Sequence, residues 1–355
     1  MKIELEEFKR LRRGLRYISD LSGFNYPRGM LFTILTQKKV DQVKQDYGKV
    51  CTRLEELSNF WSTHKKIPAW VRLTPMMRVR LLLKALEYTK REIRDSLNDP
   101  ERIDDADLRR LIWRSVFTDY IYSPIAVKHQ FARGRLGELI IEKWLDSRDI
   151  TYKTEKDLRK ESIKTPDFYF SDPIQINGFE INWIESKALF GDPRTHWIYW
   201  KKQFSKYLDL FGQGFVVYWF GRIKELDKNV KVWEEEFFRD KLMQNLLDMK
   251  IYTLGIKGKS RQEIMKTLRK FSISSVFEVG DVDTGLEKEM DVDVVHLDFE
   301  SPYSKEFIQA VGRVIDAYSK GRVILLGQSR DWRKCKRRNL SLTLRNMGFK
   351  VFHLR

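Results

Sequence analysis

Two acids and one lysine lie in the middle of the sequence, on two short apolar segments. Asp167 follows Pro166 at the start of a β-prone run, and Glu185 and Lys187 lie in a second apolar segment with one residue between them. Cleaving a phosphodiester at neutral pH needs an activated water and stabilisation of the charge that develops in the transition state, and Mg²⁺ supplies much of both. Mg²⁺ is often held by one or two carboxylates together with carbonyl oxygens and waters. These residues therefore predict metal-dependent hydrolysis of phosphodiesters, the chemistry of a nuclease.

The spacing of Glu185 and Lys187 places both on one side of a strand. Alternate residues of a strand point to the same face, so both side chains are expected to enter one cleft, with Ile184, Ser186 and Ala188 facing a helix on the other side. Three roles are open for Lys187: it orients the attacking water, removes a proton from it, or neutralises developing charge. The alternative interpretation is a surface salt bridge, because acids and lysines are common on strands.

The elements around these residues follow an α/β order. A helix from about 135 to 146 carries Glu138 and, one turn later, Glu142. The hairpin signal Asn177-Gly178 separates the first apolar segment from the second. The remaining expected elements are a strand over 150–153, a helix over 195–210, a strand over 212–220, a helical stretch over 231–250 and a strand over 251–254. This order indicates one compact domain with a mixed sheet.

Residues 1 to about 122 are predicted to be helical, and two of the helices have clear start signals. Thr74-Pro75 is an N-cap followed by proline at the first helical position, and Thr89 with Glu92 forms a capping box. Two short helices joined by a tight turn resemble a helix-turn-helix, and the second one carries the basic residues Lys90, Arg91 and Arg94. Two interpretations stay open here, a nucleic-acid contact and a capped helical hairpin without one.

From about residue 256 the chain alternates strands and helices, which suggests a Rossmann-like α/β unit. It lacks the glycine-rich G-x-G-x-x-G loop, so no nucleotide is expected. A basic run over 330–338 has the chemistry to follow a phosphate backbone, and a charged helix start is the alternative. The candidate contacts in this run are Arg333, Lys334 and Arg337.

Composition limits the classes of partner. The 355 residues carry a net charge of +17, which favours polyanions; nucleic acid comes first and an anionic membrane surface second. No apolar run is long enough to span a bilayer, and the acidic start of the chain is unlike a secretion signal. Cys51 and Cys335 are the only cysteines, which argues against a disulfide scaffold or a structural zinc site. An intracellular (cytoplasmic) protein is expected.

The order Glu138, Pro166-Asp167, Glu185-x-Lys187 resembles the PD-(D/E)xK restriction-endonuclease-like superfamily. The resemblance implies that Glu138, Asp167 and Glu185 bind Mg²⁺ or Mn²⁺, with Glu142 as the substitute for Glu138 because helix alignments slip by a turn.

Downstream, Gln203 and Tyr207 resemble the Q-x-x-x-Y helix motif of the RecB-like and Cas4-like branch of that superfamily. In that branch these residues help to hold the DNA or the site. A spacing of four residues does place both on one helix face.

A closer resemblance is to the TPD-motif family that includes the eukaryotic codanin-interacting nuclease. The strings that carry it are Thr165-Pro166-Asp167-Phe168, Trp183-Ile184-Glu185-Ser186-Lys187-Ala188, Phe190-Gly191-Asp192, His196, Gln203-Phe204, Val217-Tyr218-Trp219-Phe220-Gly221 and Glu225-Leu226-Asp227. The family implies a Mg²⁺- or Mn²⁺-dependent nuclease fold related to archaeal Holliday-junction resolvases, which often form homodimers. It also places Asp192 and His196 at the site; a helix cap and a packed histidine are the alternatives. The resemblance does not extend beyond about residue 256.

Together these observations predict an α/β multidomain protein in three parts. They are a helical, helix-turn-helix-like DNA-binding domain over 1–122, a restriction-endonuclease-like α/β/α nuclease domain over 123–255 and a Rossmann-like domain without an assigned role over 256–355. The expected activity is hydrolysis of DNA, with RNA not excluded, at junctions, flaps or single-stranded ends in repair or recombination; in a eukaryote the protein is expected in the nucleus. The alternative is a non-catalytic nucleic-acid-binding scaffold that retains the fold.

Overall fold

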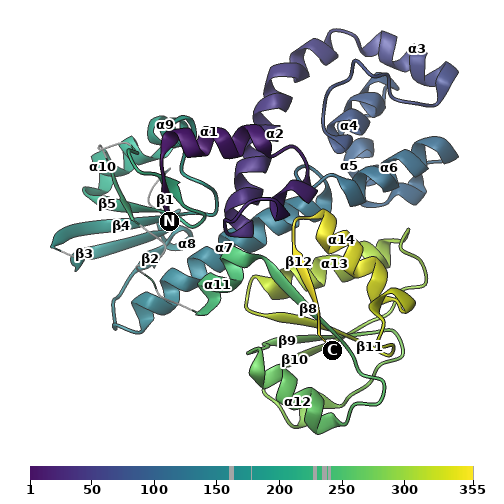
Figure 1. The fold of residues 1–355 in the computed structure, drawn as a ribbon. Helices are drawn as coiled ribbons and strands as arrows, with labels where there is room; N and C mark the ends of the chain where they lie inside the picture. Colours follow the sequence, from purple (N-terminus) through teal and green to yellow (C-terminus); the bar gives the residue numbers. More distant parts are fainter. Residues whose placement is uncertain (160–163, 177, 227–229, 234–237, 239–240, 355) are drawn as a thin grey trace. The chain divides into compact units, whose positions relative to one another are not determined.

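The computed structural model describes residues 1–159, 164–176, 178–226, 230–233, 238 and 241–354 and has a mixed α/β architecture (Figure 1). Its contacts group the chain into two compact units, each built from two segments. The first unit comprises Met1–Leu35 and Arg133–Asp248, and the second comprises Thr36–Ala132 and Met249–Arg355. The boundaries of these units differ from those of the expected parts 1–122, 123–255 and 256–355. That these parts are separate domains stays a prediction.

The sheet of the first unit has five strands in the order β2-β3-β4-β5-β7. Strands β3 and β4 form the expected antiparallel hairpin, with Phe168 opposite Ile184. Gly178 in the turn has a φ of +78°, which glycine adopts without a steric penalty; Asn177 lies outside the described residues. Strand β5 runs parallel to β4, so the sheet is mixed, as predicted. The strand bounds are β2 (Lys153–Thr154), β3 (Phe168–Ile176), β4 (Phe179–Lys187), β5 (Gly214–Tyr218) and β7 (Lys231–Trp233).

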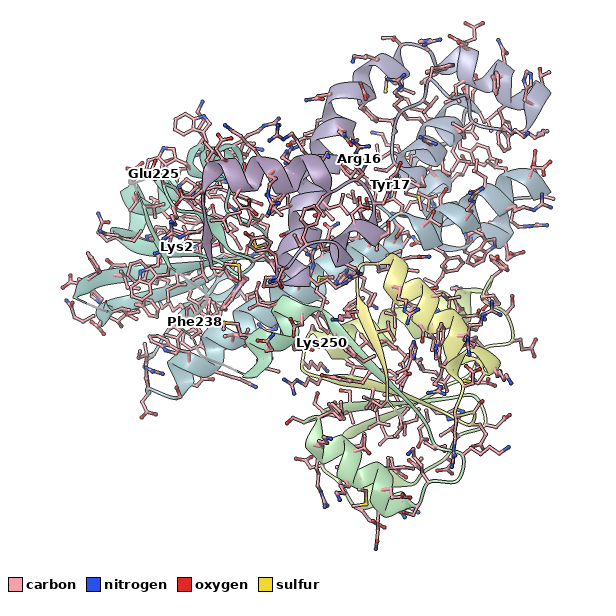
Figure 2. All side chains as sticks on the ribbon, viewed as in Figure 1. Lys2, Arg16, Tyr17, Glu225, Phe238 and Lys250 are labelled. Atoms are coloured by element: carbon pink, nitrogen blue, oxygen red, sulfur yellow. The ribbon has the colours of Figure 1, made fainter. Side chains whose placement is uncertain are left out.

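Helix α7 (Pro124–Asp146) packs under one face of this sheet (Figure 1). The indole nitrogen of the fully buried Trp219 donates to Ser186 Oγ on that face. A Cβ atom on Gly137 of α7 would lie 2.3 Å from the same indole nitrogen. Phe238, labelled in Figure 2, packs against Trp219 and against Trp144 of α7. Ser186 therefore faces a helix, as its position in the strand predicts.

The opposite face is covered by α9 (Pro193–Tyr199), the π-helical segment η3 (Trp200–Phe204) and α10 (Ser205–Phe211), with short α8 (Glu155–Leu158) near the edge. Residues from these helices pack on Trp183 and Tyr218 in one apolar cluster. The single helix expected over 195–210 is thus interrupted by a π-helical segment, a feature common at functional sites.

Two expectations for the first unit were wrong. The N-terminal part is not wholly helical: β1 (Lys2–Ile3) pairs with β6 (Arg222–Ile223), and Figure 2 labels Lys2 beside the sheet. Residues 231–233 form β7 on the edge of the sheet rather than the start of a helix, because they pair with β5. The helix of this stretch is α11 (Lys241–Asp248). Most residues between β7 and α11 are not among the residues that the structure describes. The first segment adds α1 (Leu5–Gly14), η1 (Ile18–Ser22) and the start of α2 (Arg28–Cys51).

The helices of the second unit confirm both predicted start signals: Thr74 is the N-cap of α4 (Pro75–Ala85) with Pro75 at its first position, and Thr89 is the N-cap of α5 (Lys90–Asn98). Thr89 Oγ1 accepts from the Glu92 backbone, and the Glu92 carboxylate accepts from the Thr89 backbone, so the capping box is present. Thr74 is the N-cap residue but makes no side-chain cap bond. The buried Asp119 carboxylate replaces it and accepts from the Met76 backbone at 2.8 Å. The helices are α3 (Leu54–His64), α4 (Pro75–Ala85), α5 (Lys90–Asn98), η2 (Pro100–Arg102) and α6 (Ala106–Thr118).

The sheet of the second unit is parallel throughout, in the order β10-β9-β11-β8-β12. Its strands are β8 (Lys250–Gly255), β9 (Ser275–Val279), β10 (Asp293–Leu297), β11 (Val323–Gly327) and β12 (Lys350–Leu354). Between them run α12 (Arg261–Lys270), η5 (Leu286–Lys288), α13 (Lys305–Tyr318), η6 (Trp332–Lys334) and α14 (Arg337–Asn346). Strand β8 pairs with β11 and β12, whereas the boundary expected after residue 255 assigned it to the central part.

Across the described part of the chain, no helix combines the length and the apolar composition that crossing a membrane requires.

Candidate active site

The two predicted acids are joined by hydrogen bonds between neighbouring strands. The Asp167 carboxylate accepts from the Ser186 backbone at 2.7 Å, and the Glu185 carboxylate accepts from the Asp167 backbone at 3.2 Å. These bonds follow from the hairpin, because Phe168, the residue after Asp167, pairs with Ile184, the residue before Glu185. Both carboxylates are therefore held in fixed positions on one side of β4.

Lys187 points to the same face as Glu185, as its spacing predicts. Its ammonium group donates to the Glu185 carboxylate and lies 4.7 Å from the centre of the Tyr199 ring. Burial lowers the pKa of Lys187, but the Glu185 and Asp167 carboxylates raise it, so this pKa lies above its ordinary value. A raised pKa favours the charged ammonium and disfavours a role as proton acceptor.

The environment of Asp167 disfavours its ionised form. Burial, followed by the neighbouring Glu185 carboxylate, raises the pKa of Asp167 well above its ordinary value. Two carboxylates that share a buried site repel each other, and a cation placed between them relieves that repulsion. Perturbed acids of this kind are concentrated at functional sites.

A cavity of about 340 Å³ opens beside Asp167 and contains the predicted helix acids. Glu138 and Glu142 of α7 line it together with Asp167, and so does Arg135. The Arg135 guanidinium forms two hydrogen bonds to Glu142, at 2.7 and 2.8 Å, and one longer bond of 3.4 Å to Glu138. Both helix acids thus share one arginine. In the part of the chain that the structure describes, no hydrogen bond links Glu138 to Asp167 or Glu185, although the charge of Glu138 contributes to the raised pKa of Asp167.

The acidic residues of the site meet the requirements of a divalent cation only in part. Asp167 and Glu185 supply the one or two carboxylates that Mg²⁺ takes from a protein. Within the described ranges, no group of three or more His, Cys, Asp or Glu residues is arranged to hold a metal ion. Glu138 could complete such a group only after Arg135 releases it. The metal set Glu138, Asp167 and Glu185 therefore stays a prediction.

Tyr207 and Gln203 lie on the helices above the site. The Tyr207 hydroxyl donates to the Thr165 carbonyl at 2.8 Å and so holds the Thr165-Pro166-Asp167 loop in place. Burial, with Glu185 and Asp167, raises the pKa of Tyr207, which keeps the phenol protonated. Gln203 lies in the π-helical segment, and its side-chain oxygen is buried with no hydrogen-bond partner among the residues described.

Asp192 and His196 have the structural roles that were weighed as alternatives. The Asp192 carboxylate caps α9 through the Arg194 and Thr195 backbones. His196 is buried, and its Nδ1 lies 2.9 Å from the Tyr218 hydroxyl. The expectation that His196 contacts nucleic acid does not agree with this burial, because the ring has almost no exposed surface.

The basic residues predicted to contact nucleic acid lie in different surroundings. Lys90 and Arg94 line a second cavity, and Arg91, on the same helix, is exposed beside Asp95. Arg333 pairs with Asp331, and Lys334 lies in the adjoining turn.

Arg337 does not fit a surface contact. It is 1% exposed, and its guanidinium donates to the Ser329 carbonyl. The expected contact of Arg337 with a phosphate backbone does not agree with this burial, because the guanidinium faces the protein interior.

Two residues of the site were missed by the reasoning from sequence. The Tyr199 ring lies beside the Lys187 ammonium in the structure. Tyr199 comes four residues before Gln203 in the sequence, and this helical spacing could have indicated that Tyr199 belongs to the site. Arg135 lies three and seven residues before the two helix acids, a spacing that also places it on their face.

Comparison with known proteins places the chain in a family. The family described as "Protein of unknown function TPD sequence-motif" matches residues 104–239. CDAN1-interacting nuclease 1 of Gallus gallus is 30% identical over 219 residues, which cover 56% of this chain and 76% of that protein. The chain belongs to this TPD-motif family of CDAN1-interacting nuclease-like proteins.

Other family members match a shorter stretch. CDAN1-interacting nuclease 1 of Homo sapiens is 34% identical over 163 residues, and that of Bos taurus is 37% identical over 142 residues. These matches cover 44% and 40% of this chain, and 58% and 50% of the two relatives, so the chain spans about half the length of these relatives. No solved structure matches the chain.

Proposed function

We propose that this member of the TPD-motif family is a metal-dependent nuclease that hydrolyses phosphodiester bonds of DNA. The observation that carries the proposal is the joint placement of Asp167, Glu185 and Lys187 on one side of the β3–β4 hairpin. The name of the relatives, a nuclease, agrees with it. The central sheet with helices on both faces is compatible with a restriction-endonuclease-like fold. The proposal also includes a role in DNA repair, a homodimer and a cytoplasmic or nuclear location.

In this proposal Asp167 and Glu185 hold Mg²⁺ or Mn²⁺, with Glu138 as a third ligand. A bound divalent ion would supply a Lewis acid and a template for the phosphate and the attacking water. The surrounding residues fix the two acids: the Ser186 backbone donates to Asp167, and Tyr207 anchors the preceding loop through the Thr165 carbonyl.

Of the three roles considered for Lys187, neutralisation of developing charge and orientation of water are the ones we propose. Its raised pKa keeps it charged, and Glu185 fixes its direction. A charged donor in a water-poor site stabilises a developing anion more strongly than one exposed to solvent.

The test is a cutting assay on labelled duplex, single-stranded, flap and four-way-junction DNA with Mg²⁺ or Mn²⁺. Asp167→Ala and Lys187→Ala should abolish cutting and largely spare binding, whereas Asp209→Ala, an exposed acid on α10, should change neither. Absence of cutting by the unmodified protein on every substrate, and on RNA, would refute the proposal.

A second candidate is a nucleic-acid-binding scaffold that retains the fold without catalysis. It is favoured by Arg135, whose positive charge is hydrogen-bonded to both Glu138 and Glu142 and so occupies the place of a cation beside them. Both candidates predict binding that weakens with salt. The two candidates differ in the expected effect of Mn²⁺, because the scaffold predicts that added Mn²⁺ leaves the thermal midpoint of the protein unchanged.

A further inference from the structure

A second cavity of about 340 Å³ lies within the helical part of the second unit, between α4, α5 and the start of α7. Arg80 of α4 and Lys90 and Arg94 of α5 supply its polar lining, and the apolar lining includes Ile93 and Leu97. Cavities that bind small ligands begin at about 300 Å³. This one is therefore large enough for one small group and too narrow for a double helix.

The charged side chains in the lining of this cavity are all basic, and none of the described residues that line it carries a carboxylate. Among the described residues, neither Arg80 nor Lys90 has an acid within 4 Å. Arg94 lies 3.3 Å from Asp95, but Asp95 is shared with Arg91 at 3.7 Å and lies outside the lining. Such a surplus of positive charge favours an anion, and above all one that also presents an apolar face.

The walls of the cavity are held in place by hydrogen bonds before any ligand arrives. The buried Asp119 carboxylate accepts from the backbones of Ile121 and Tyr122, each at 2.8 Å, and also from Met76 at the start of α4. Gln130 donates to the Ile121 carbonyl at 2.7 Å. Tyr122, which lines the cavity, is thus fixed to α4, and a fixed wall loses little freedom on binding.

The position of the basic residues on two helices distinguishes this cavity from a single helix that reads a duplex groove. A recognition helix presents its side chains outward to base edges. Here Lys90 and Arg94 of α5 line the open side of a hollow together with Arg80 of α4, with 69% of the Arg94 side chain exposed, whereas the neighbouring Arg91 lies outside the lining. The hollow accepts a nucleotide only if that nucleotide is not stacked in a double helix.

We propose that this cavity binds one unpaired nucleotide of a nucleic-acid strand. Its phosphate contacts Arg80 and Lys90, and its base lies against Ile93, Leu97 and Tyr122, since aromatic and apolar side chains bind unstacked bases without regard to sequence. The inference deepens the proposed function by naming the substrate class, strands with an unpaired end or flap. It does not depend on catalysis, because binding needs no metal.

The experiment measures binding of the full chain to fluorescent DNA by anisotropy in EDTA, so that nothing is cut. A single strand is compared with a blunt duplex of the same sequence. Arg80→Ala and Lys90→Ala are the test variants, and Arg91→Ala is the matched control, because it removes one charge from the same helix outside the cavity. Val127→Trp, at a half-exposed residue of the lining, fills the cavity without changing the charge.

The expected result is tighter binding of the single strand than of the duplex, and loss of this preference in Arg80→Ala, Lys90→Ala and Val127→Trp but not in Arg91→Ala. For the single strand, each lost phosphate contact should reduce the slope of log affinity against log salt by about 0.7. Circular dichroism and thermal midpoints establish that each variant is folded.

Three results would overturn the inference. One is equal binding of single strand and duplex, and another is an equal effect of Arg91→Ala and Lys90→Ala, which would indicate a general surface charge. The third is binding of free nucleoside monophosphate as tightly as the strand, which would indicate a small-ligand site. The nuclease proposal stands or falls separately. A chain that binds as expected but never cuts removes only the nuclease, and a chain that cuts but binds single strand and duplex equally removes only this inference.

Discussion

Two glycines of α7 allow the packing behind the active site to be tested with opposite expected signs. Gly137→Ala would place a Cβ atom 2.3 Å from the Trp219 indole nitrogen, whereas a Cβ on Gly134 would meet nothing within 4 Å. Alanine within a helix is worth about 1 kcal/mol over glycine. Gly134→Ala should therefore stabilise the protein by up to about 1 kcal/mol.

For Gly137→Ala the same gain is opposed by the cost of overpacking, which is typically about 1–3 kcal/mol. Trp219 is fully buried and packs on Phe238 with ring centres 5.2 Å apart, so it has little room to move. We expect a net destabilisation of about 1–2 kcal/mol from these two opposing effects. Because Trp219 donates to Ser186, whose backbone holds Asp167, DNA cutting should fall as well.

The assay is urea unfolding of both variants followed by tryptophan fluorescence and far-UV circular dichroism, with the cutting rate measured on the same preparations. Stabilisation by both alanines would refute the argument, since it would mean that Trp219 moves aside at no cost. Destabilisation by both would show that α7 tolerates no side chain at either position, and the clash with Trp219 would no longer explain the effect.

Three further predictions concern the site itself. Tyr207→Phe removes a 2.8 Å hydrogen bond to a backbone carbonyl and should cost about 1 kcal/mol of stability. Its control, Tyr26→Phe, removes a 2.9 Å bond to Glu7, which is not one of the site residues, so cutting that falls equally in both variants would count against a positioning role. Asp167→Asn should raise the thermal midpoint in EDTA at neutral pH. The pKa of Asp167 is higher in the folded protein than in the unfolded chain, so ionisation of this carboxyl destabilises the fold. The destabilisation is absent at low pH and grows as pH rises toward the folded pKa. Midpoints measured across pH should converge below about pH 4, the ordinary Asp value, and a gap that persists there would contradict the assignment. Arg135→Ala should tighten Mn²⁺ binding in calorimetry, because it frees Glu138 as a ligand; an unchanged affinity would exclude Glu138 from the metal set.

Local rules were enough to predict several parts of the molecule from sequence. Glu185 and Lys187 share a face because a strand has a period of two, and the Thr89–Glu92 box begins a helix because its bonds join residues three apart. The alternation of strands and helices after residue 256 was predicted, since each element there has its own apolar pattern. In these cases the interactions that decide the structure lie within a few residues.

Other features depended on contacts between segments far apart in the chain. Asp119 caps α4 from 43 residues away, in place of Thr74, and no local pattern indicates this. Arg337 looks like a surface cation in sequence, and only the packing of α14 shows that it is buried. Strand β8 could equally have extended the central sheet, because an apolar run does not specify its partner.

The candidate site likewise has some features that the sequence determines and others that only the folded chain decides. The Asn177-Gly178 signal predicted the hairpin, and the residue types and spacing of Asp167, Glu185 and Lys187 predicted the chemistry it could perform. Tertiary structure decided that Lys187 is a buried cation with a raised pKa and that Glu138 is held by Arg135. The physical reason is that a side chain's chemical type is a property of the sequence, whereas its protonation and availability depend on burial and on neighbouring charges, which only the folded chain brings together.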